Sequence, residues 1–76
     1  GQSCNGSKRI VVIDDLFDAF SAKFNAAIGG LSYEAGDFGP LSSEAATRTL
    51  IEQVQIAIDQ GADVLVGDNS PDGNVY

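Results

Sequence analysis

The sequence predicts an α/β fold, an incomplete parallel-sheet unit in the order strand, helix, helix, strand. Two short apolar runs, rich in β-branched residues, lie toward the two ends of the chain, at 9–13 and 63–67. Continuous apolar runs of this kind are typical of strands buried on both faces of a parallel sheet. Between them, two stretches carry apolar residues every three or four positions, which is the spacing of one helical face. Because parallel strands need a crossover connection, helices between them fit this order.

The first helix is expected directly after the first strand. Asp14 or Asp15 is expected to cap its N-terminus, and Gly29 with Gly30 to end it. Its apolar face consists of Leu16, Phe17, Phe20, Phe24, Ala27, Ile28 and Leu31. Aromatic residues at this spacing indicate a packing surface rather than a ligand cage.

A loop and a second helix follow. Residues 32–40 are rich in Gly, Pro and Asp and are expected to form the loop. Ser42 or Ser43 is expected to cap the helix, with the Glu44 carboxylate near the positive end of the helix dipole. Gly61 stands where a helix commonly ends in a left-handed residue. The apolar stripe of this helix is Ala46, Leu50, Val54, Ala57 and Ile58.

A chain of this length is expected to need neighbours. Seventy-six residues bury only about 60% of the surface that the unfolded chain exposes, and two parallel strands leave both sheet edges open. The first residue is Gly rather than Met, so we expect the chain to begin inside a longer protein. The remainder of a larger sheet, or a second copy of the chain, would then cover the two strands.

Composition argues against several classes of protein. Four Lys and Arg residues against eleven Asp and Glu give a net charge of −7, which disfavours binding to nucleic acids and anionic membranes. No apolar run approaches the ~20 residues of a membrane span, and we see no signal peptide. With one cysteine and no histidine, neither a disulfide framework nor a zinc site is expected. We interpret Asp14, Asp15 and Asp18 as a solvated helix start rather than a metal site.

Cys4 is the candidate reactive group. A cysteine attacks as its thiolate, which converging backbone N–H groups and positive charges stabilise. Small neighbours leave room for a substrate, and Lys8 and Arg9 bring positive charge. A free cysteine is more often a buried, inert residue, however, and the chain has no histidine to act as its base. A single thiol is also typical of a reducing compartment, so we expect a cytoplasmic location.

The order of landmarks resembles the NAD(P)-dependent aldehyde dehydrogenase family. Gly1-Gln2-Ser3-Cys4, followed by small residues, a basic residue and an apolar run, is similar to the active-site cysteine signature of that family. Further matching landmarks follow in order along the chain, namely 14–20, Gly36-Asp37, Gly39-Pro40-Leu41 and 60–67. The resemblance covers essentially the whole chain. Within the family, the cysteine signature and the Gly-Pro-Leu-Ser-Ser-Glu turn look most like those of bacterial succinate-semialdehyde dehydrogenases.

The resemblance implies that residues 1–76 are part of a catalytic domain, without the cofactor-binding domain. It implies that Cys4 is the nucleophile, whose thiolate adds to the aldehyde carbon while the backbone N–H of Cys4 helps to hold the oxyanion. Hydride transfer to NAD or NADP and hydrolysis of the thioester would then give the carboxylic acid. Ser3 is expected beside the substrate. No cofactor-binding residue is identified, and the deacylation base and the oxyanion asparagine are expected outside the chain.

The implied partners are a small aldehyde, a nicotinamide cofactor and further copies of the chain in a homo-oligomer. The isolated chain is expected to be inactive and to bind no cofactor. Two features depart from the family pattern: only Phe38 separates Asp37 from Gly39, and Asp68 stands where a second glycine is common. The alternative is a non-catalytic α/β interaction module that self-associates through its exposed strand edges.

Overall fold

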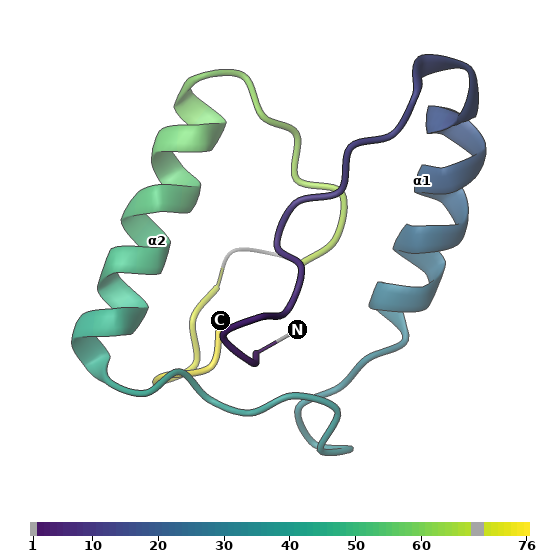
Figure 1. Ribbon diagram of the computed structural model, residues 1–76. Helices are drawn as coiled ribbons and strands as arrows, with labels where there is room; N and C mark the ends of the chain where they lie inside the picture. The colour runs from purple at the N-terminus through teal and green to yellow at the C-terminus, as the bar shows by residue number, and fades with distance from the viewer. Residues whose placement is uncertain (1, 68–69) are drawn as a thin grey trace. The chain divides into compact units, whose positions relative to one another are not determined.

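The computed structural model describes residues 2–67 and 70–76 (Figure 1). Gly1, which opens the cysteine signature, and Asp68, where the sequence departs from the family pattern, lie outside the described residues. The chain divides into two units, Gly1–Gly30 and Leu31–Tyr76, and each contains one helix.

Helix α1 spans Asp14–Gly29 in the first unit (Figure 1). The prediction that Asp14 or Asp15 caps this helix was wrong: the capping position belongs to Ile13, and no side chain caps the first turn. Both aspartates lie inside the first turn, where their negative charge still meets the positive end of the helix dipole. The predicted end is confirmed, because the helix stops at Gly29 and Gly30 is its C-terminal capping residue.

The apolar face of α1 is uncovered within its unit. No residue of the helix is buried, and the side chains of Leu16 and Phe17 are 55% and 50% exposed. The rings of Phe20 and Phe24 stack with their centroids 5.4 Å apart, as the four-residue spacing favours. A shallow groove on this face is lined by Val12, Leu16, Ala19, Phe20 and Lys23. The surface is therefore suited to packing, but none of the described residues of this unit covers it.

Helix α2 spans Glu44–Asp59, and both of its ends have specific capping contacts. The Ser43 hydroxyl accepts a hydrogen bond of 3.0 Å from the backbone N–H of Ala46, so of the two predicted caps Ser43 is the one used. At the other end, Gly61 has φ +102°, as predicted for a residue that ends a helix. The N–H groups of Gly61 and Ala62 donate to the carbonyls of Ile58 and Ala57, which is the Schellman arrangement.

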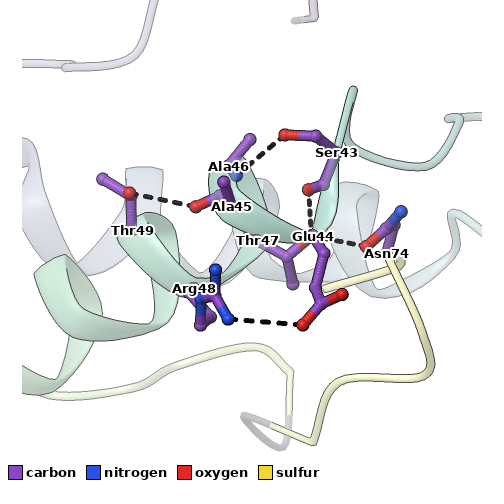
Figure 2. A network of polar contacts seen from close by, with 8 residues as sticks. All are labelled: Ser43, Glu44, Ala45, Ala46, Thr47, Arg48, Thr49 and Asn74. Carbon is purple, nitrogen blue, oxygen red and sulfur yellow. Dashed lines mark hydrogen bonds and ion pairs between the residues drawn. The ribbon is translucent and has the colours of Figure 1, made fainter.

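The C-terminal tail is tied to the start of α2. The backbone N–H of Leu41 donates to the Asn74 carbonyl over 2.7 Å, and Asp72 and Val75 form an isolated antiparallel bridge. Thr47, only 4% exposed, donates to Asn74 of this tail and is the one buried residue among those described (Figure 2). The best-packed point of the second unit is thus a polar contact rather than an apolar core.

The predicted strand–helix–helix–strand unit is not confirmed. Within residues 2–67 and 70–76 there are two helices and no strand, and neither 9–13 nor 63–67 is paired. Both segments are open to solvent, with Val11 99% and Leu65 60% exposed. A strand needs a neighbour to satisfy its backbone N–H and C=O groups, and the described residues supply none to either segment.

Candidate active site

Cys4 lies in a tight turn. The backbone N–H of Gly6 donates to the Ser3 carbonyl over 2.9 Å, so Cys4 and Asn5 are the two central residues of a four-residue turn. The thiol is free and exposed. The structure therefore presents Cys4 to solvent instead of burying it as a small apolar residue.

Lys8 folds back onto this turn. Its Nζ donates to the carbonyl oxygens of Ser3 and Gly6, each over 2.7 Å. The sequence indicated only that Lys8 brings positive charge near Cys4; it did not indicate that the ammonium binds the ends of the turn. The signal available in the sequence was a long cationic side chain two positions after a Gly, within reach of the preceding carbonyls.

Ser3 lies in the same turn as Cys4. Its carbonyl accepts from both Gly6 N–H and Lys8 Nζ, and the residue as a whole is exposed. Ser3 therefore directly precedes Cys4 on an exposed part of the turn, and its contact with a substrate stays a prediction.

The turn supplies a nucleophile, backbone N–H donors and a cation, but no base. Among the described residues, no hydrogen bond links the Cys4 thiol to a carboxylate. The described part of the chain also brings together no group of three His, Cys, Asp or Glu residues able to hold a metal ion.

Neither described helix is long and apolar enough to cross a membrane.

A second polar cluster lies in the loop of the second unit. The backbone N–H of Ser32 donates to Asp37 Oδ2 over 2.9 Å, and its hydroxyl donates to Glu34 Oε2 over 2.7 Å. The hydrogen bond from Ser32 lowers the pKa of the Glu34 carboxyl, and a backbone hydrogen bond acts in the same direction. Gly36, with φ +82°, allows the tight reversal that closes this loop.

Comparison with known proteins identifies the family. The Aldehyde dehydrogenase family matches residues 1–76, which is the whole chain. Because this match extends over every residue, the chain belongs to the aldehyde dehydrogenase family.

Its relatives include several semialdehyde dehydrogenases. The chain is 44% identical over 77 residues to a succinate-semialdehyde dehydrogenase [NADP(+)] of Deinococcus radiodurans, with 95% of this chain and 16% of the relative aligned. It is 36% identical over 78 residues to the protein of the same name from Mycolicibacterium paratuberculosis, covering 96% of this chain and 16% of that one. A glutarate-semialdehyde dehydrogenase of Pseudomonas putida is 35% identical over 81 residues, covering 100% of this chain and 17% of that one.

The chain therefore spans about a sixth of the length of these relatives. No solved structure gives a significant match.

Proposed function

We propose that the protein containing this chain oxidises a semialdehyde to a dicarboxylic acid with NAD(P)⁺, and that Cys4 is its nucleophile. The observation that carries the proposal is the exposed thiol at the centre of the Ser3–Gly6 turn, in a chain that matches the family from end to end. Residues 1–76 would form part of the catalytic domain of that protein.

The first step is covalent. The Cys4 thiolate forms a bond to the aldehyde carbon while the carbonyl π pair moves to the oxygen, which gives a thiohemiacetal oxyanion. The backbone N–H of Cys4 donates to this oxyanion. Ser3, one position earlier, lines the approach to the thiol.

Collapse of the oxyanion would expel a hydride from the substrate carbon, for which bound NAD(P)⁺ would be the acceptor, and would leave a thioester on Cys4. Water would then break the carbon–sulfur bond, which gives the carboxylic acid and frees the thiol. The sequence contains no Gly-x-Gly-x-x-Gly motif, so residues 1–76 do not form a dinucleotide site of that type. We assign no cofactor contact to any of these residues. The isolated chain is accordingly expected to be inactive.

Succinate semialdehyde is the proposed substrate. Support comes from the names of relatives from two bacteria, at 44% and 36% identity, while a further relative is named for glutarate semialdehyde, the homologue one methylene longer. One methylene changes kcat/KM by about 10- to 200-fold in a fitted pocket. We expect the full-length enzyme to prefer succinate semialdehyde over glutarate semialdehyde by a factor in this range, and to act least well on butanal, which lacks the carboxylate.

The decisive experiment is steady-state kinetics of the full-length enzyme and its Cys4→Ala variant. Removal of the nucleophile is expected to lower kcat by at least about 1,000-fold. The matched control is Ser42→Ala, an exposed residue outside the turn, which should retain wild-type kcat. Activity retained by Cys4→Ala would refute the role of Cys4, whereas equal use of butanal and succinate semialdehyde would refute only the substrate.

Two further properties belong to the same proposal. In the full-length protein, segments 9–13 and 63–67 pair with flanking chain as strands, since their apolar residues are exposed here. The enzyme works in the cytoplasm as a homo-oligomer; a free, exposed thiol is consistent with a reducing compartment.

A further inference from the structure

We propose that Lys8 is a positioning residue for the reaction at Cys4: its ammonium fixes the Ser3–Cys4 peptide, and thereby the N–H that receives the oxyanion. The inference rests on the proposed function of Cys4. Lys8 would hold the Ser3–Gly6 turn so that the Cys4 N–H points toward the oxyanion.

The contacts close the turn from both ends. Nζ of Lys8 lies 2.7 Å from the carbonyl oxygen of Ser3, the first residue of the turn, and 2.7 Å from that of Gly6, the last. Such short bonds from a charged donor are about twice as strong as neutral ones. The backbone bond of the turn itself runs from Gly6 N–H to the Ser3 carbonyl, and this bond and both lysine bonds are exposed to water. The lysine therefore adds two hydrogen bonds to the backbone bond that closes the turn.

Peptide geometry connects this contact to the chemistry. A peptide unit is planar and trans, so the Ser3 carbonyl and the Cys4 N–H lie in one plane and point in opposite directions. A donor that fixes the Ser3 oxygen therefore also fixes the direction of the Cys4 N–H. Hydrogen bonding to the oxygen further polarises the peptide and strengthens its N–H as a donor.

The Lys8 ammonium contacts the two ends of the Cys4 turn and forms no ion pair among the described residues. Both of its acceptors are uncharged carbonyls, and the one ion pair among the described residues joins Arg48 to Glu44 in the second unit. Lys8 therefore acts on the turn as a charged donor rather than as half of an ion pair.

The test uses the full-length enzyme with Lys8→Met, Lys8→Arg and, as the matched control, Lys23→Met on α1. A misdirected oxyanion donor costs about 100-fold in rate, so Lys8→Met is expected to lower kcat by about that factor, with KM changed less than about threefold. Arginine keeps the positive charge and has enough N–H donors for both carbonyls, so Lys8→Arg should restore kcat to within about tenfold of wild type. Lys23→Met should match wild type.

Alkylation of Cys4 by iodoacetamide, followed by mass spectrometry of its peptide, separates positioning from loss of fold. Alkylation does not use the oxyanion donor, so loss of the Lys8 charge can slow it only by lowering the thiolate fraction, and its rate in Lys8→Met should fall by no more than about fivefold. An unchanged kcat, or alkylation falling by the same factor as kcat, would overturn the role of Lys8. Neither result would contradict the proposal that Cys4 is the nucleophile. That proposal is tested separately, by the activity of Cys4→Ala.

Discussion

The hydroxyl of Thr47 donates to the side-chain oxygen of Asn74 over 3.1 Å, across 27 positions of sequence (Figure 2). The same hydroxyl lies 3.0 Å from the Ser43 carbonyl one turn earlier in the helix, so a single proton is shared between two oxygens. Because Thr47 is 4% exposed, water cannot readily replace either bond. This contact holds the C-terminal tail against the start of α2.

Removal of the Thr47 hydroxyl should release the tail. Valine has nearly the shape of the threonine side chain but no hydroxyl, so Thr47→Val leaves the Asn74 side-chain oxygen without its donor. The lost hydrogen bond is expected to lower the stability of the tail contact by about 1 kcal/mol. We expect the Leu41 amide, which donates to the Asn74 carbonyl, to exchange its hydrogen about fivefold faster. Thr49→Val is the control, because the exposed Thr49 hydroxyl bonds to the Ala45 carbonyl within the same helix. Equal exchange in the two variants would show that the Thr47 contact does not hold the tail.

The Ser43 cap should contribute measurably to the stability of α2. Ser43→Ala removes the acceptor of the Ala46 N–H and is expected to destabilise the helix by about 1 kcal/mol. Hydrogen exchange of the Ala46 amide measures the loss directly. In the control, Ser42→Ala, the cap is intact and the Ala46 amide should exchange at the wild-type rate. If that amide exchanged equally fast in Ser42→Ala and Ser43→Ala, the result would argue against a specific cap by Ser43.

Two glycines should respond to alanine in opposite ways. Gly61 has φ +102°, a conformation in which a Cβ costs about 1–2 kcal/mol, so Gly61→Ala should weaken the C-terminal end of α2. Gly29, the last residue of α1, has no positive φ and open space where a Cβ would stand, so Gly29→Ala should be neutral or stabilising. Thermal melting of the two variants shows whether each substitution raises or lowers the melting temperature. A higher melting temperature for Gly61→Ala would contradict the Schellman arrangement at the end of α2.

The loop of the second unit should be sensitive to acid. The lowered pKa of Glu34 means that the fold favours the ionised carboxylate, so this stabilisation is present above the ordinary carboxyl pKa and is lost as pH falls through the lowered value. Ser32→Ala removes the main cause and should raise the pKa of Glu34 toward its ordinary value. A ¹³C NMR titration of the side-chain carboxyl measures this, with Ser42→Ala expected to leave it unchanged. An unaltered titration in Ser32→Ala would refute the assignment.

The 76-residue chain on its own should be inactive and associated. No described apolar residue is buried, so its two helical faces and its extended segments remain exposed. Size-exclusion chromatography should show species larger than a monomer, and assays with NAD⁺ or NADP⁺ should show no aldehyde oxidation. A monomer that unfolds cooperatively would contradict the first expectation, and turnover of any aldehyde would contradict the second.

Local signals in the sequence predicted the helices well. The spacing of apolar residues and the positions of Gly29, Ser43 and Gly61 indicated both helices and most of their ends, because capping and helix termination depend on neighbouring residues. The cap of α1 was missed because an aspartate can lie before the first turn or inside it, and the sequence does not distinguish the two. The two apolar runs did not form strands because pairing depends on partners elsewhere in space.

The sequence by itself determined the family, the candidate nucleophile and the presence of two helices with most of their ends, since these follow from motif order and from contacts a few residues apart. Only the tertiary structure decided how the ends of the Cys4 turn are held and which residue is buried. Lys8 reaches both Ser3 and Gly6 because a long side chain can fold back on its own backbone. Thr47 meets Asn74 because the tail returns to α2, a contact across 27 positions that no local pattern encodes.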